Sequence, residues 1–139
     1  MLCSEIMKQH VECLSAVESV QTAARRMRDN ELGFMPVCDD QLNVLGTVTD
    51  RDLVIRVLAE KLPATTPVGD IMTPEVVACR PEDDVRIAER LMGENHKSRI
   101  LCVDESGRLS GVISLSDLAS FEDASRVART LREITEREA

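Results

Sequence analysis

The sequence has no tryptophan and no tyrosine, and it has only two phenylalanines. Nucleic-acid-binding proteins use a basic face and usually stacking rings, whereas this chain of 139 residues carries a formal net charge of −8. Both features argue against a general nucleic-acid-binding protein. No apolar run approaches the about 20 residues of a membrane span, and the first ten residues lack the apolar centre of a signal peptide. We therefore expect a cytoplasmic protein that does not bind membranes.

Cysteines are few and scattered. They are Cys3, Cys13, Cys38, Cys79 and Cys102. Their odd number and irregular spacing fit neither a disulfide framework nor a CxxC metal site. We expect them to be reduced, with the strand cysteines acting as small core residues. His10 and His96 have no second ligand at metal spacing, so they are interpreted as surface residues and no metal site is predicted.

The dominant positive feature is an internal repeat. With 43% hydrophobic and 30% charged residues, the chain can bury a core. Residues 5–53 align without a gap with residues 70–118, at a constant offset of 65 residues. The identical pairs include Met7 and Met72, Val20 and Val85, Arg25 and Arg90, Asn30 and Asn95, and Gly46 and Gly111. The chain is therefore a tandem duplication within one domain, and each half is too small to be stable alone.

Each half predicts the order strand, helix, strand, strand, helix, which is an α/β (α+β) fold. The predicted strands are Val11–Leu14, Phe34–Cys38 and Val44–Thr49, then Val76–Cys79, Arg99–Val103 and Leu109–Ser114. The last helix is expected to run from Leu115 through the charged tail. We divide the chain into repeat 1 (1–62), a linker (63–68), repeat 2 (69–122) and a helical extension (123–139).

The repeated segment with the most chemical character is a strand-to-helix corner. It reads Gly46-Thr47-Val48-Thr49-Asp50-Arg51-Asp52 in the first half and Gly111-Val112-Ile113-Ser114-Leu115-Ser116-Asp117 in the second. A carboxylate can accept hydrogen bonds from both hydroxyls of a ribose, and a hydroxyl with backbone amides at a helix start suits a phosphate. The same spacing is also that of a capping box, in which these atoms satisfy the helix's own amides. The residues alone leave both interpretations open.

The repeated corner within this element order resembles a tandem pair of cystathionine-β-synthase (CBS) domains, or Bateman module, of the small stand-alone prokaryotic type. The resemblance covers about residues 3 to 120. It implies two halves packed by their sheets around a pseudo-twofold axis, with two clefts for adenosine-containing ligands. It also implies that Asp52 and Asp117 hold ribose hydroxyls, and that Thr49 and Ser114 contact phosphate.

The resemblance extends to five neighbouring residues. They are Asp50, Arg51, Met35, Pro36 and Arg99. Arg51 is a phosphate candidate, although Asp50 and Asp52 offer it simple ion pairs. Arg99 occupies a position where the family often has a basic residue, and its alternative is an exposed strand residue paired with a surface acid. Its counterpart Phe34 cannot bind phosphate, so we expect the two clefts to differ.

Two functional hypotheses follow. The first is a regulatory sensor that binds AMP, ADP or ATP foremost, or NAD or S-adenosylmethionine, and signals to a partner protein by a conformational change. The alternative is a ligand-free structural or dimerisation module whose corners only cap helices. An enzyme is not expected, because the sequence has no Gly-rich phosphate loop and no nucleophile in a signature context. The resemblance implies a homodimer and no covalently bound cofactor.

Overall fold

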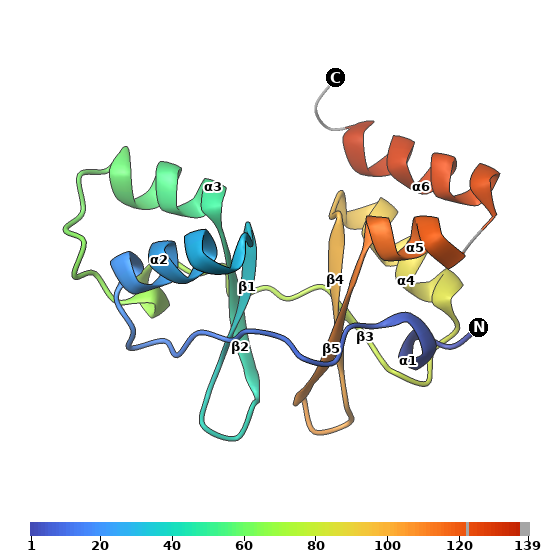
Figure 1. Cartoon of the computed structure of the whole chain (residues 1–139), viewed down its shortest axis with the longest axis horizontal. Coiled ribbons are helices and arrows are strands. Elements are labelled where there is room, and N and C mark those ends of the chain that lie inside the picture. The colour runs from blue at the N-terminus through green and yellow to red at the C-terminus, as the bar shows by residue number, and fades with distance from the viewer. Residues whose placement is uncertain (122, 137–139) are drawn as a thin grey trace. The chain divides into compact units, whose positions relative to one another are not determined.

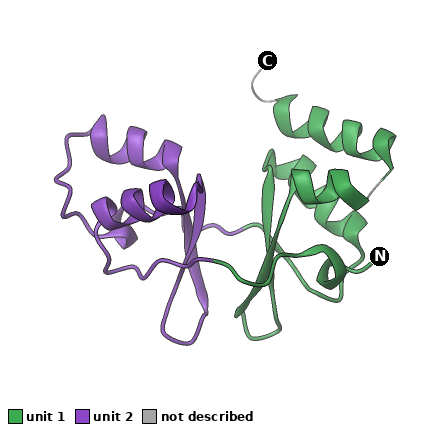
Figure 2. Cartoon of the chain, in the orientation of Figure 1, with its two compact units in different colours: residues 1–11, 77–139 green, residues 12–76 purple. Residues whose placement is uncertain are grey.

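The chain forms two compact units (Figure 2). In the computed structural model, which describes residues 1–121 and 123–136, unit 1 comprises Met1–Val11 and Val77–Ala139, and unit 2 comprises Glu12–Val76. Each unit therefore combines the main part of one repeat with the short lead-in segment of the other. The mixture of helices and strands confirms the predicted fold class.

The two units contain similar series of elements (Figure 1). Unit 2 contains α2 (Val20–Asn30), β1 (Phe34–Cys38), β2 (Val44–Thr49), α3 (Asp50–Asp52), η1 (Leu53–Leu58) and η2 (Val68–Asp70). Unit 1 contains α1 (Cys3–Ile6), β3 (Ala78–Cys79), α4 (Val85–Asn95), β4 (Arg99–Val103), β5 (Leu109–Ser114), α5 (Leu115–Phe121) and α6 (Ala124–Thr135). Among the described residues, no helix is both long and apolar enough to cross a bilayer.

The strands pair in the same way in both units. β1 and β2 are antiparallel, as are β4 and β5, and each pair has a register irregularity at its equivalent end. The predicted strand at Val11–Leu14 is shorter than expected, because only Leu14 makes a bridge, parallel to Val37. Its counterpart in unit 1 is the two-residue strand β3, parallel to β4. The predicted positions of the four longer strands are confirmed.

The lead-in segments explain the glycine that starts each corner motif. Lys8 pairs with Val112 through two backbone hydrogen bonds of 2.9 and 3.0 Å. Thr73, which occupies the same place in the other repeat, pairs with Thr47 through bonds of 3.0 and 2.9 Å. A Cβ atom on Gly111 would lie 2.7 Å from the carbonyl oxygen of Lys8. Glycine is therefore required here by the close approach of a second backbone.

The first helix of each repeat buries apolar residues at helical spacing. In α2 the residues Val20, Ala23 and Met27 are buried in the core of unit 2. Ser19 is the N-cap, and its hydroxyl accepts a hydrogen bond of 3.1 Å from the amide of Thr22. In α4 the N-cap is Asp84, and its carboxylate accepts a hydrogen bond from the amide of Arg86.

We expect Ser19→Ala to lower the free energy of unfolding by about 1 kcal/mol, because the amide of Thr22 loses its acceptor. Urea denaturation monitored by circular dichroism measures the change. Ser15→Ala is the matched control, because Ser15 precedes α2 and its hydroxyl accepts a long hydrogen bond of 3.5 Å from the amide of Val17. An equal loss of stability in Ser19→Ala and Ser15→Ala would contradict the assignment of Ser19 as the N-cap.

The closing helices differ from the expectation in two ways. The first begins as α3 and continues as the π-helical segment η1, where the amide of Ala59 bonds the carbonyl of Val54 five residues earlier, at 2.9 Å. The second was predicted as one continuous helix, and this is wrong. It ends at Phe121, and α6 begins separately at Ala124 with Asp123 as its N-cap. The break lets α6 turn back and pack on α4.

The contact between α4 and α6 is close and polar. A Cβ atom on Gly93 would collide with the side chain of Glu133. The ring Nδ1 of His96 lies 2.8 Å from the carbonyl oxygen of Glu133, so His96 is tied to α6 and is only half-exposed. Arg126 donates to the buried carboxylate of Glu89 at 2.6 Å. The charged tail is thus a packed part of unit 1.

Candidate ligand site at the strand-to-helix corners

The two corners have the same hydrogen-bonding geometry. At the end of β2, the hydroxyl of Thr49 accepts from the amide of Asp52 at 3.1 Å, and the amide of Thr49 donates to Oδ2 of Asp52 at 2.9 Å. At the end of β5, Ser114 and Asp117 make the same two bonds, at 3.1 and 2.9 Å. Both corners are therefore capping boxes, as the alternative interpretation requires.

The capping box uses only one oxygen of each aspartate. Oδ1 of Asp52 lies 3.8 Å from Nε of Arg56, and Oδ1 of Asp117 lies 3.8 Å from Nζ of Lys8. These ion pairs are too long to be hydrogen bonds. The two carboxylates are 16% and 14% exposed, so water reaches them only in part. Each Oδ1 can therefore accept a hydroxyl from a ligand without breaking the cap.

The backbone amides of the first corner are already engaged. The amide of Asp50 donates to the carbonyl of Gly33 at 3.0 Å, and the amide of Arg51 donates to Oδ1 of Asp50 at 2.9 Å. Together with the amide of Asp52, these groups form the start of the helix. The amides of Asp50 and Arg51 already have acceptors within the protein, so they are not free to hold a phosphate at this corner. A phosphate here must be held by side chains, such as the exposed Arg51.

The second corner differs in charge. Leu115 and Ser116 stand at the positions that Asp50 and Arg51 occupy in the first repeat. The amide of Leu115 donates to the carbonyl of Ser98 at 2.8 Å. The hydroxyl of Ser116 lies 2.8 Å from that of Ser114, so this corner offers two adjacent hydroxyls. It also has one carboxylate fewer than the first corner, because Leu115 replaces Asp50.

The strand register brings Arg99 to the second corner. Arg99 is the cross-strand partner of Ser114, and its side chain is exposed. Phe34 is the equivalent partner of Thr49. The sequence predicted that the two corners differ at this position. In each corner the differing residue, Arg99 or Phe34, is the cross-strand partner of the hydroxyl residue.

Met35 and Pro36 follow Phe34 along β1. Met35 pairs with Val48 and is fully buried in the core of unit 2. Pro36 pairs with Thr47 and is also buried. Both lie within two residues of the strand end that carries Thr49, but within unit 2 their side chains contribute to packing.

Two cations near the aspartates were missed at the sequence level. Arg56 follows Asp52 by one helical turn, and this i, i+4 spacing was a usable signal. Its guanidinium also donates to the carbonyl of Ile71 at 2.9 Å. Lys8 is far from Asp117 in the sequence, and only the pairing of the lead-in with β5 brings the two together. No local pattern predicts that contact.

A pocket of about 270 Å³ in unit 2 has Arg56, the ion-pair partner of Asp52, in its lining. Its lining residues are Ile55, Arg56, Glu60, Leu62, Asp70, Ile71 and Met72. Within the described part of the chain, no group of three or more His, Cys, Asp or Glu side chains is arranged to hold a metal ion.

Comparison with known proteins agrees with the duplicated fold and the repeated corner. The family model described as "CBS domain" matches the chain twice, over residues 3–59 and 68–124. The chain therefore belongs to the CBS domain family and carries a tandem CBS pair.

One relative is the uncharacterized protein YlbB of Bacillus subtilis, which is 33% identical over 95% of this chain and 90% of its own length. The crystal structure of the CBS domain protein TA0289 of Thermoplasma acidophilum, described as of unknown function, has a TM-score of 0.83 and 25% identity, and covers 96% of this chain and 75% of its own. The structure of CBSX2 in complex with AMP has a TM-score of 0.76 and 25% identity, and covers 86% of this chain and 93% of its own.

Proposed function

We propose that this protein is a non-catalytic regulatory module that binds an adenine nucleotide, AMP, ADP or ATP, at its strand-to-helix corners. Binding changes the conformation or assembly of the protein, and a partner protein responds to the change. The observation that carries the proposal is the divided use of each aspartate, with one oxygen on the helix start and the other facing a cation at 3.8 Å. The complex of the similar protein CBSX2 with AMP supports the ligand class.

Each residue has a defined part in the proposal. Asp52 and Asp117 accept the ribose hydroxyls through Oδ1, the oxygen that faces Arg56 or Lys8 at 3.8 Å. Thr49 and Ser114 face the phosphate side of the ligand. A charge-assisted hydrogen bond of this kind contributes about 1.5–3 kcal/mol where water is excluded.

We propose that the second corner binds the nucleotide more tightly. Arg99 lies across the strand from Ser114, and a guanidinium can form a bidentate pair with a phosphate. The first corner has Phe34 at that position and has Asp50 as an additional negative charge. Arg51 offsets this charge in part, and Met35 and Pro36 stay proposed as ligand-binding residues.

The alternative function is a structural or dimerisation module, and the complete capping boxes favour it. In that case the aspartates stabilise only their own helices. The proposed homodimer and the regulated partner protein are compatible with both functions, so assembly alone does not separate them.

A ligand panel separates the two functions. We expect one or more of AMP, ADP, ATP, NAD and S-adenosylmethionine to raise the melting temperature by several degrees. A ligand at about 100 times its dissociation constant adds about 2.7 kcal/mol to the stability of the folded state. Adenine and ribose 5-phosphate, tested separately, are the controls for the two parts of the nucleotide. If none of the five ligands changes the melting temperature at millimolar concentration, the structural module is the better account.

A further inference from the structure

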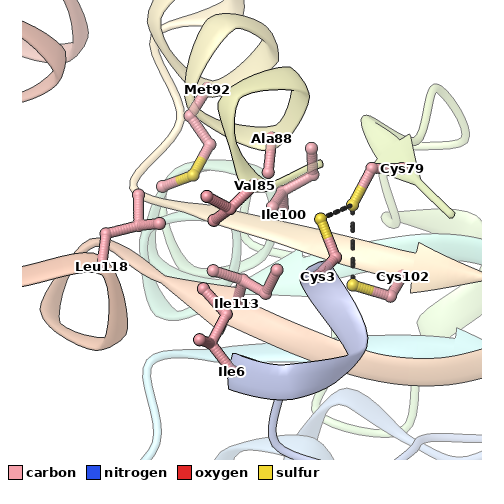
Figure 3. Close-up of a cluster of buried hydrophobic side chains, with 10 residues drawn as sticks. All are labelled: Cys3, Ile6, Cys79, Val85, Ala88, Met92, Ile100, Cys102, Ile113 and Leu118. Carbon is pink, nitrogen blue, oxygen red and sulfur yellow. Dashed lines mark hydrogen bonds between the residues drawn. The ribbon is translucent and has the colours of Figure 1, made fainter. Parts of the chain in front are cut away.

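Three of the five cysteines meet in the core of unit 1 (Figure 3). Sγ of Cys79 lies 3.7 Å from Sγ of Cys3 and 3.5 Å from Sγ of Cys102. Cys3 comes from α1, Cys79 from β3 and Cys102 from β4, and the side chains are at most 4% exposed. The scattered spacing in the sequence gave no sign of this cluster.

The first repeat shows that packing does not require thiols at these three positions. The first repeat fills the equivalent positions with aliphatic side chains. These are Val68, Leu14 and Val37, all buried in the core of unit 2. An aliphatic core is thus compatible with this fold, and sulfur at all three places suggests chemistry that hydrocarbon side chains cannot provide.

We propose that Cys3 and Cys79 form a thiol redox site, which a hydroperoxide oxidises to a disulfide that fastens α1 to β3. A disulfide has sulfur atoms about 2.05 Å apart, so the two atoms must approach from 3.7 Å. Cys79 and Cys102 are fixed as cross-strand partners, whereas Cys3 lies on a helix of only four residues. Cys3 is therefore the thiol that moves.

The short helix also provides access for the oxidant. α1 is held to the loop before α4 by backbone bonds from Cys3 to Asp83 at 2.8 Å and from Ser4 to Pro81 at 2.9 Å. A helix of only four residues opens at a lower free-energy cost than the rest of the fold. A small neutral hydroperoxide can reach the thiols in that open state.

The electrostatics favour Cys3 as the attacking group. Hydrogen bonds from the thiols of Cys102 and Cys79 lower the pKa of Cys3 to about 4, against the opposing effects of burial and of Asp83. Hydrogen bonding with Cys102 and Cys3, together with burial, raises the pKa of Cys79. The thiolate is the reactive form of cysteine, so the opposite directions of the two pKa shifts favour Cys3 over Cys79 as the attacking group.

The reaction has two steps. The thiolate of Cys3 attacks one oxygen of hydrogen peroxide, the O–O bond breaks, and a sulfenic acid forms while the released hydroxide takes up a proton. The sulfur of Cys79 then attacks the sulfur of Cys3, the S–O bond breaks, and water leaves with the proton of Cys79. The two cysteines lose two electrons in total, and the peroxide is reduced to two molecules of water.

The test uses the full chain with Cys13→Ala and Cys38→Val, because Ala78 and Val103 occupy those positions in the other repeat. Treatment of the reduced protein with hydrogen peroxide should lower the titratable thiols from three to one. Peptide mass mapping should identify a Cys3–Cys79 link. The melting temperature should rise by at least about 5 °C, because the link closes a long loop, and should return after addition of dithiothreitol.

The matched control is Cys3→Val in the same background, which places the side chain of Val68 at the equivalent position. It should keep both remaining thiols and show no rise in melting temperature. A Cys79–Cys102 link, unreacted thiols, or stoichiometric zinc that protects them would each overturn the proposal. Mapping the wild-type protein answers the same question if the control variant fails to fold.

Discussion

Replacing Gly111 by alanine should lower the free energy of unfolding by about 3 kcal/mol. The new Cβ atom would lie 2.7 Å from the carbonyl oxygen of Lys8 and 2.8 Å from the side chain of Met7. A flexible methionine can move, but the carbonyl cannot retreat without weakening the two backbone bonds between Lys8 and Val112. Overpacking costs about 1–3 kcal/mol, and each weakened hydrogen bond adds about 1 kcal/mol.

Ser110→Ala is the control for Gly111→Ala, because it places alanine at the neighbouring position of the same strand. It should change the stability by less than about 1 kcal/mol. Equilibrium unfolding in urea, with the slope compared between variants, measures both effects. If the two variants are equally stable, the lead-in segment is not held against β5 as the structure has it.

Replacing Asp117 by asparagine should weaken adenine-nucleotide binding at the second corner by about 10- to 150-fold. Asparagine keeps an acceptor for the amide of Ser114, so the capping box survives in part. It removes the charge and turns one oxygen into a donor, which removes about 1.5–3 kcal/mol of interaction with a ribose hydroxyl. The stability without ligand should fall only slightly.

The first corner gives the matched experiment. Asp52→Asn makes the same change in a capping box with the same distances, but beside Phe34 in place of Arg99. If the second corner is the tighter site, Asp52→Asn should change the dissociation constant of that tighter site only slightly. Titration calorimetry on the wild type and both variants measures this, and tight binding unchanged by either substitution would refute the assigned roles.

Local patterns predicted most of the elements. The helical spacing of apolar residues in α2 and α4 and the short strand-forming runs of β1, β2, β4 and β5 depend on residues close in the sequence. The order of these elements was therefore predicted, and the four strands lie at the predicted places. The capping box at Thr49 and Ser114 was also a local signal. The sequence indicates that these residues can cap a helix, whereas the position of each second carboxylate oxygen depends on the fold.

Contacts between distant segments could not be predicted. The exchange of lead-ins brings Lys8 to Asp117 and Cys3 to Cys79, and no pattern in either segment specifies its partner. The break before α6 is different, because Asp123 followed by Ser125 was a recognisable helix start. The apolar spacing that continues through the tail favoured one long helix and concealed that signal.

The central claim is that an adenine nucleotide binds at the strand-to-helix corners, and amide chemical shifts test it most directly. AMP is titrated into ¹⁵N-labelled protein, and the backbone amides of Thr49, Asp52, Ser114 and Asp117 are followed in ¹H–¹⁵N spectra. We expect saturable shifts concentrated at Ser114 and Asp117, with weaker shifts at Thr49 and Asp52 at higher concentration. The absence of saturable shifts at these four amides up to millimolar AMP, or saturable shifts confined to residues remote from both corners, would contradict the account.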